Sequence, residues 1–324
     1  MDIIADLKSR ARHEPRKIVF PEGDNSLILE VAQYLAKNQY ANPVVLGAPQ
    51  DRIDELNQYG VQTVDIASDP LLDSYVEDYC RSREMPEAVG RYMVSQALCF
   101  ACMMVKTGRA DALVAGINVP TEEVILACQM ILGLQEGISV PSSFSLLKIP
   151  GYRGSYGHFL IFADPSIQPD PSSIELADIA CMTANTVKKL LHWEPKVALL
   201  SFSTKGSAVH PRVQKVVDAV VELKKRNCDF AFDGELQLDA AINQMVAKKK
   251  IRENNAAVAG QANVLIFPDL NAGNIGLKLV EQFANAKMYG PILQGFKFPV
   301  SDLSRGAVFE DIVGSALIIS ALCT

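Results

Sequence analysis

The sequence predicts an α/β protein of two domains, each with a mainly parallel sheet covered by helices. Short apolar runs of strand length alternate with segments whose apolar residues recur at helical spacing. Such alternation is typical of parallel sheets flanked by helices. A chain of 324 residues is long enough for about two domains. Hydrophobic residues make up 49% and charged residues 21%, so the chain can bury a sizeable core.

In the first part of the chain, strands and helices are expected to alternate. Strands are predicted at the runs KIVF, PVVLG and DALVAG, which occupy 17–20, 43–47 and 111–116. Helices are predicted over 26–37, 88–106 and 121–134.

The middle differs, because two apolar runs at 143–149 and 158–164 flank GYRGSYG and predict a pair of strands. The segment QPDPSS at 168–173 predicts a loop that ends in a helix N-cap. A second α/β unit follows, with helices expected over 174–191, 211–225 and 238–248 and strands at 196–203, 229–234 and 262–269. The segment 290–306 is expected to be rich in loops, before a final helix over 308–322.

Composition excludes some classes of protein. The net charge of −6 argues against a nucleic-acid partner, because phosphate backbones need a basic surface. A few local cations would still hold a small anionic substrate. No run is long and apolar enough for a transmembrane span, and the start MDIIADLKSRARHEPRK lacks the apolar core of a signal peptide. We therefore expect a cytoplasmic protein without a nucleic-acid or membrane partner.

The seven cysteines are scattered, and their odd number without a framework predicts reduced thiols. Cys99 and Cys102 form a C-x-x-C pair within ALCFACMMV. We interpret this stretch as the apolar face of a buried helix, because no second Cys or His pair near it completes a metal site. The four histidines show no metal-ligand spacing either, so the sequence predicts no metal site.

In open α/β sheets, ligands collect beyond the carboxyl ends of strands. The segment SFSTKGSA places Ser203, Thr204, Lys205 and Ser207 between a predicted strand and a helix. Hydroxyls, one ammonium group and backbone N–H groups would suit an anion there. A helix cap beside a solvated lysine explains the segment equally well.

Two further segments combine a strand end with polar residues. DGELQLDAA holds Asp233, Glu235 and Asp239, three carboxylates that could bind a metal. We favour helix capping and ion pairs, because no second acidic cluster accompanies them. FPDLNAGN predicts a tight turn, from which the amides of Asn271 and Asn274 could point at a ligand.

The fourth segment, PVSDLSRGAVFED, places Ser304, Arg305 and Asp311 before and within the start of a helix. An arginine guanidinium matches two phosphate oxygens at once. A serine hydroxyl can hydrogen-bond a reacting carbonyl, and a nearby carboxylate can act as a general base. A capped helix start with an ion pair would give the same pattern. The motifs G-x-G-x-x-G and G-x-x-x-x-G-K-[ST] are both absent, so nothing indicates a nicotinamide cofactor or an ATPase.

Taken together, the motifs SFSTKGSA, DGELQLDAAI, ANVLIFPDLNAGNIGLK, GPILQG and DLSRGAVFEDIV resemble the phosphate acetyltransferase family, which also contains phosphate butyryltransferases. The resemblance is dense over 195–320 and looser through KIVFPEG and ADALVAG. It implies an architecture related to the isocitrate and isopropylmalate dehydrogenases, with an active-site cleft between two domains. These would be 1–137 plus 291–324, and 138–290. It also implies a homodimer without a bound metal or prosthetic group, in which coenzyme A is a substrate.

The family reaction converts acetyl phosphate and coenzyme A into acetyl-CoA and phosphate, in either direction. By resemblance, Asp311 matches the base for the coenzyme A thiol, Ser304 the serine that assists at the reacting centre, and Arg305 the arginine that binds phosphate. Arg81, or alternatively Arg83, matches a further arginine. Direct transfer in a ternary complex requires no cysteine nucleophile.

One motif departs from the family pattern. Where the family reads G-A-x-H-S-x-x-D-T-L-R, this chain has GINVPTEEVIL, with Val119 in place of the histidine and Leu126 in place of the arginine. The missing cation leaves two alternatives open: an acyltransferase for a longer chain such as butyryl, or a non-catalytic paralogue that binds acyl phosphate or coenzyme A. A decarboxylating dehydrogenase would need a metal-binding aspartate set and a nucleotide loop, which cannot be assembled from this sequence.

Overall fold

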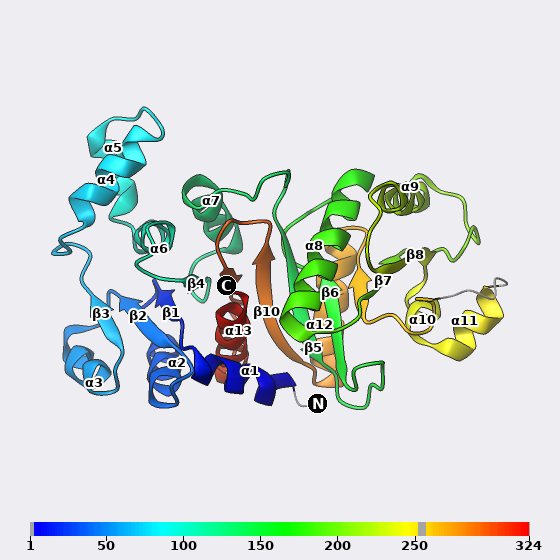
Figure 1. Cartoon of the computed structure of the whole chain (residues 1–324), viewed down its shortest axis with the longest axis horizontal. Helices are drawn as coiled ribbons and strands as arrows, with labels where there is room; N and C mark the ends of the chain where they lie inside the picture. Colours follow the sequence, from blue (N-terminus) through cyan, green and yellow to red (C-terminus); the bar gives the residue numbers. More distant parts are fainter. Residues whose placement is uncertain (1–2, 252–256, 324) are drawn as a thin grey trace. The chain divides into compact units, whose positions relative to one another are not determined.

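The computed structural model describes residues 3–251 and 257–323. The chain divides into two compact units, Met1–Glu136 with Phe296–Thr324, and Gly137–Gly295. Within each unit, strands and helices alternate along the chain and most paired strands run parallel, so the predicted α/β class is confirmed (Figure 1).

The sheet of the first unit is built from parallel strands in the order β3-β2-β1-β4-β11. The strands are β1 (Lys17–Phe20), β2 (Asn42–Leu46), β3 (Gln62–Val64), β4 (Ala112–Ala115) and β11 (Val300–Asp302). Val19 of β1 pairs with Val44 on one side and Leu113 on the other, which makes β1 a central strand. The three strands predicted in this part are confirmed as β1, β2 and β4, whereas the short β3 and β11 were not foreseen.

Helices surround this sheet. They are α1 (Ile3–His13), α2 (Ser26–Lys37), α3 (Ile53–Gln58), α4 (Leu72–Arg81), α5 (Glu87–Val94), α6 (Ala97–Lys106), α7 (Thr121–Ile131) and α13 (Phe309–Leu322), with a 3₁₀ turn at Gln50–Arg52. The prediction of one helix over 88–106 was wrong, because α5 and α6 meet at a bend of 94°. Gln96 has an extended backbone, with ψ of 132°, and serves as the N-cap position of α6. Among the described residues, no single helix has the length and apolar character to cross a membrane.

The C-x-x-C pair lies in α6, where Cys99 and Cys102 are both buried among apolar neighbours. Burial raises the pKa of the Cys99 thiol to about 11, so this thiol stays protonated. The Cys102 thiol hydrogen-bonds Cys128 of α7, and this contact together with burial raises its pKa as well. The interpretation of this stretch as a core helix is confirmed.

The second unit has a mixed sheet in the order β10-β5-β6-β9-β7-β8. Its strands are β5 (Ser142–Lys148), β6 (Phe159–Ala163), β7 (Lys196–Leu200), β8 (Ala231–Leu236), β9 (Val264–Ile266) and β10 (Lys287–Gln294). β5 and β6 are antiparallel, with Leu146 opposite Ile161, which confirms the predicted strand pair. β10 was wrongly expected to be a loop. Pro291 lies at an irregularity in the pairing of β10 with β5, where a missing N–H is tolerated.

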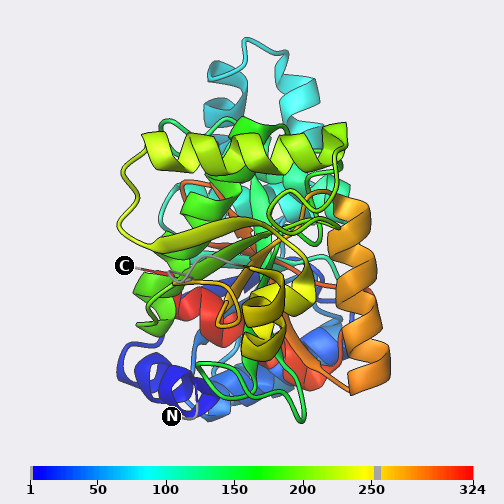
Figure 2. The same ribbon diagram turned by 90° about the vertical axis from the view of Figure 1, so that its right-hand side faces the viewer.

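The helices of the second unit are α8 (Ser173–Leu191), α9 (Pro211–Lys225), α10 (Leu238–Ile242), α11 (Gln244–Lys250) and α12 (Leu270–Ala284), and Figure 2 shows α9 and α12 at its surface. The predicted cap of α8 is confirmed as a capping box of Ser172 and Glu175. Asn243 breaks the helix expected over 238–248 into α10 and α11. The helix α12 was missed, because its first turn, LNAG, has the composition of a turn.

Candidate active site

Three neighbouring strands of the first unit, β1, β4 and β11, end beside one another, and their loops carry polar groups. Glu22 follows β1, Asn118 follows β4 and Ser304 follows β11. The Asn25 side chain donates to Asn118 Oδ1 at 3.0 Å, so the first two loops are joined. This strand end is the candidate site of the first unit.

The loop after β4 is wrapped around the carboxylate of Glu22. Glu22 Oε2 accepts the N–H groups of Gly116 and Ile117 at 2.8 and 3.2 Å, and Oε1 accepts those of Asn118 and Val119 at 2.6 and 3.0 Å. We call this arrangement the Glu22 clamp. Its carboxylate is buried, and four N–H donors match its acceptor capacity. The clamp gives a structural reason for a glutamate directly after β1, in the sequence Pro21-Glu22-Gly23. The sequence alone did not identify Glu22 as part of the site.

The loop after β11 carries the three residues predicted to be catalytic. Ser304 is half-buried, and its Oγ accepts the Gly306 N–H at 3.3 Å. The guanidinium of Arg305 is exposed and, among the described residues, forms no ion pair, so it is available to an anion. Asp311 is the third residue of α13 and accepts the Val308 N–H at 3.1 Å, which caps the helix. All three residues therefore lie on one short segment at the start of α13.

Arg81, the predicted arginine outside this loop, ends α4 and is exposed. It pairs with Glu77 one turn earlier in the same helix. The alternative, Arg83, donates to the Tyr79 carbonyl at 3.0 Å and lies over the Tyr79 ring at 4.0 Å. Arg83 is thus held in place by Tyr79. Arg81 is held only by its exposed ion pair with Glu77, which a ligand could replace.

In the second unit, the segment 201–208 follows β7, and its hydroxyl groups form hydrogen bonds to other residues of the same unit. Ser203 is buried, and its Oγ donates to Glu235 Oε1 at 2.8 Å. Thr204 Oγ1 accepts the Gln237 N–H at 2.9 Å and donates to the Gln237 side chain at 3.2 Å. These side chains join the loop after β7 to the end of β8 and to Gln237, which follows it.

The three carboxylates of the second unit, Asp233, Glu235 and Asp239, bind neighbouring groups of the protein. Asp233 pairs with Lys205, whose ammonium also donates to the Gly234 carbonyl at 3.0 Å. Glu235 accepts the Gly206 N–H at 2.7 Å, and Asp239 pairs with Lys250 at 2.8 Å. The ion pairs of the favoured interpretation are confirmed for Asp233 and Asp239, whereas the expected helix cap is not found, because the N-cap residue of α10 is Gln237 and forms no side-chain cap. In the described ranges, no cluster of His, Cys, Asp or Glu has the makings of a metal site.

The two predicted asparagines lie in the first turns of α12. Asn271 is exposed, and Asn274 donates to the Pro165 carbonyl at 3.1 Å. Between them, a Cβ on Gly273 would meet the Asp164 carbonyl oxygen at 2.6 Å, so only glycine permits this close approach. The motif NAGN therefore seats α12 against the end of β6, which a prediction of a turn could not reveal.

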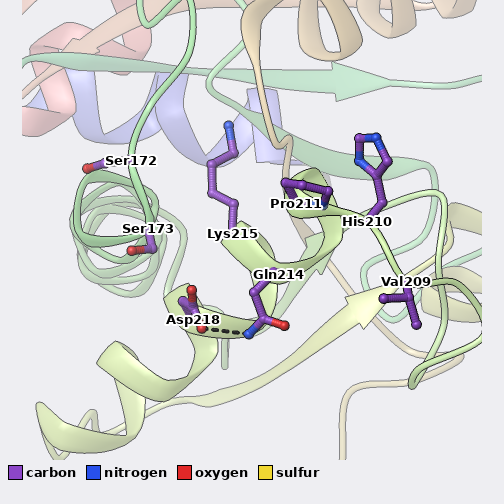
Figure 3. A pocket seen from close by; sticks show the side chains of 8 residues that line it. All are labelled: Ser172, Ser173, Val209, His210, Pro211, Gln214, Lys215 and Asp218. Atoms are coloured by element: carbon purple, nitrogen blue, oxygen red, sulfur yellow. Dashed lines mark hydrogen bonds between the residues drawn. The ribbon is translucent and has the colours of Figure 1, made fainter.

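An open pocket of about 610 Å³ lies at the N-terminal ends of α8 and α9 (Figure 3). It is lined by Ser172, Ser173, Val209, His210, Pro211, Gln214, Lys215 and Asp218. The Lys215 ammonium donates to Asp170 at 2.6 Å and to the Pro268 carbonyl at 2.9 Å, so its charge is already matched. None of the predicted site residues lines this pocket, although it adjoins the segment 201–208.

Parallel strand ends that carry hydroxyls and cations are where α/β enzymes bind anionic substrates. The phosphate acetyl/butaryl transferase family matches residues 2–320, and the chain belongs to this family. It is therefore a transferase.

Individual relatives agree with this membership. The phosphate acetyltransferase of Thermoanaerobacterium thermosaccharolyticum is 40% identical over 320 residues, which cover 97% of each chain. A phosphotransacetylase structure from Streptococcus pyogenes has a TM-score of 0.88 and 35% identity, and the match covers 99% of this chain and 98% of that one. A Salmonella typhimurium structure described as a 4-hydroxythreonine-4-phosphate dehydrogenase has a TM-score of 0.51 and 13% identity. The match covers 95% of this chain and 97% of that one, and it shows that the fold is shared with that structure.

Proposed function

We propose that this chain catalyses the reversible transfer of an acetyl group between acetyl phosphate and coenzyme A. The observation that carries the proposal is the segment from β11 into α13, which presents Ser304, an exposed Arg305 and the carboxylate of Asp311. Relatives named phosphate acetyltransferase match nearly the whole chain, which supports acetyl as the group transferred.

In this mechanism, Asp311 accepts the proton of the coenzyme A thiol as the sulfur attacks the acetyl carbonyl carbon. A free thiol has a pKa of about 8.5, so only a minority is thiolate near neutral pH. Ser304 donates a hydrogen bond to the carbonyl oxygen as it gains charge. Arg305 holds the phosphate group, which leaves with the electron pair of the broken carbon–oxygen bond. The products are acetyl-CoA and phosphate.

This chemistry uses proton transfer and charge stabilisation alone, so we propose that no resident cofactor takes part and that coenzyme A enters as a substrate. We also propose that Arg81, Lys205 and Asn271 contribute to substrate binding, because their side chains are accessible and polar. The predicted binding roles of Ser203, Thr204 and Asn274 stay predictions. Their side chains bond to the protein itself.

A longer acyl substrate is the second candidate, and one observation favours it. Leu126 of α7 is 56% exposed where the family pattern implies a cation. An exposed leucine would accommodate additional methylene groups, each worth about 0.8 kcal/mol when buried.

The purified protein should form thioester when incubated with coenzyme A and acetyl phosphate. The same assay with propionyl and butyryl phosphates compares kcat/KM across chain lengths. A preference for acetyl phosphate supports the proposal, and a preference for butyryl phosphate supports the second candidate. No thioester from any of the three acyl phosphates would leave the non-catalytic paralogue as the explanation.

We further propose a homodimer that forms through α12. Ile275, Leu279 and Phe283 are 57%, 50% and 83% exposed and lie at intervals of four residues on one helix face. An exposed apolar stripe of this kind marks an association surface. In a two-fold dimer, the stripe on α12 of one copy would contact the same stripe of the second copy.

Replacing Leu279 and Phe283 together by Glu should convert the dimer to a monomer, because two carboxylates would be buried without partners. Light scattering on a sizing column should give twice the chain mass of 35.3 kDa for the unmodified protein and a single chain mass for the variant. Gln282→Glu adds one charge at an exposed position of the same helix and should leave the dimer intact. A monomeric unmodified protein would contradict the proposal.

We propose a cytoplasmic location, since coenzyme A chemistry and unpaired cysteines suit a reducing compartment. All seven cysteines are free. The net charge of −6 fits small anionic substrates held by local cations rather than nucleic acid.

A further inference from the structure

Asp302, the last residue of β11, is a buried carboxyl group two residues before Ser304. It is 1% exposed, and its Oδ2 accepts a hydrogen bond from Thr121 Oγ1 at 2.6 Å. Thr121 is the first residue of α7. Among the described residues, Asp302 Oδ1 has no hydrogen-bond partner, although it is fully enclosed. The side chain thus links the end of β11 to the start of α7 through one oxygen.

Gly116, which directly follows β4, lies against Asp302 Oδ1. A Cβ at this glycine would lie 2.1 Å from Asp302 Oδ1 and 2.9 Å from the Leu303 nitrogen. The Gly116 backbone has φ of +108°, a conformation that other residues rarely adopt. Gly116 therefore packs closely against this enclosed oxygen, and burial disfavours a charge on Asp302.

The electrostatic surroundings favour the neutral form of this side chain. Burial, the largest cause, raises the pKa of Asp302 to about 7, against the opposing hydrogen bonds from the Thr121 side chain and the Leu303 backbone. The negative charge of Glu22 raises it further. The other charged groups on the first turns of the neighbouring helices α7 and α13 are also acidic, namely Glu122, Glu123, Glu310 and Asp311. Arg305, three residues further on, is exposed.

We propose that Asp302 is a positioning residue, held as a neutral acid, which fixes Ser304 and Arg305 against the first turn of α7. Leu303, which lies between Asp302 and Ser304, is 1% exposed, so a shift of Asp302 is passed on to the loop. The proposal rests on the acetyl transfer proposed above and adds a residue to it.

Three variants test the positioning role in the thioester assay. Asp302→Ala and Thr121→Val remove the link to α7, and misplacement of the loop should lower kcat about 10- to 100-fold. The KM for acetyl phosphate should rise, because Arg305 moves, while the KM for coenzyme A stays unchanged. Asp302→Asn keeps a neutral group of the same shape with an oxygen that accepts from Thr121, so it should retain most of the turnover.

The matched control is Asp69→Asn in the same unit. The Asp69 side chain is 4% exposed and pairs with Arg109 at 2.9 and 2.7 Å, so its loss disturbs folding without touching the site. If Asp302→Ala lowers only the melting temperature, as Asp69→Asn should, the positioning role is overturned. If Asp302→Asn is as impaired as Asp302→Ala, the neutral acid is not the working form. An unmodified protein that makes no thioester would instead overturn the proposed function itself, and this inference with it.

Proton linkage gives a second measurement that needs no substrate. The pKa of Asp302 is about 7 in the folded protein against 3.8 as its ordinary value, so the folded state binds the proton more tightly. Stability should therefore be fullest below about pH 4, decline as pH rises toward 7, and level off above it. Urea unfolding of Asp302→Asn should lack this decline. Identical pH profiles for the variant and the unmodified protein would overturn the neutral-acid assignment.

Discussion

Asp311→Asn is expected to lower turnover by about 10²–10⁴-fold near neutral pH, the range that general-base catalysis typically contributes. Asparagine keeps the shape of the side chain and cannot take the thiol proton. Its carbonyl oxygen can still accept the Val308 N–H, so α13 stays capped and the protein folds. The measurement is steady-state thioester formation at saturating acetyl phosphate and coenzyme A.

The pH dependence of this loss identifies its cause. The ratio of variant to unmodified turnover should rise toward the thiol pKa of about 8.5, because the thiolate then forms without a base. Glu310→Gln removes the neighbouring acid in the same helical turn and should leave turnover unchanged. A variant with normal turnover at every pH would make Asp311 a helix-capping charge worth at most ~1 kcal/mol of stability. A large loss that ignores pH would mean that Asp311 positions Arg305 instead.

Arg305→Ala is expected to reduce kcat/KM for acetyl phosphate by about 10²-fold or more. Charge-assisted hydrogen bonds contribute about 1.5–3 kcal/mol each, and a guanidinium makes two in parallel to a phosphate. The KM for coenzyme A should change far less. Arg305→Lys should not restore activity well, because an ammonium group lacks the planar fork. Initial rates over a matrix of both substrate concentrations separate the two KM values.

The control for Arg305 is Arg91→Ala, which removes an exposed arginine from α5 in the same unit. It should leave both KM values unchanged. Unfolding in urea should show equal stability for Arg305→Ala and the unmodified protein, since the side chain is exposed and makes no ion pair in the described structure. An unchanged kcat and KM for acetyl phosphate in Arg305→Ala would remove this residue from the phosphate site.

The elements that were predictable from sequence are those with a strong local pattern. Ile18–Phe20 of β1 and the run ALVA of β4 are apolar and buried, and their short length and β-branched residues identify them as strands. β10 escaped prediction because Gly290 and Pro291 are typical of loops, and only its pairing with β5 makes it a strand. The bend between α5 and α6 escaped for the converse reason, since an apolar pattern of helical period continues across Ser95 and Gln96.

The sequence could predict which segments carry the candidate site residues. It could not predict which residues those side chains contact. The motifs placed Ser304, Arg305 and Asp311 before and within the start of a helix, and the structure has the first two in the loop before α13 and Asp311 in its first turn. The pairing of Lys205 with Asp233 joins residues 28 positions apart, which no local pattern reveals. Asp302 and Glu22 were overlooked, because a single buried carboxylate has no sequence signature until its backbone donors are placed around it.

The Glu22 clamp has a consequence for how the enzyme meets its substrate. The amides of Gly116, Ile117, Asn118 and Val119 already surround an anion that belongs to the protein. Their ordering entropy is therefore lost during folding, and an arriving acyl phosphate need not supply it. With these donors occupied, we expect the proposed substrate to be recognised at this strand end by side chains rather than by a closing backbone loop. We therefore expect the loop after β4 to keep the same conformation before and after the substrate binds.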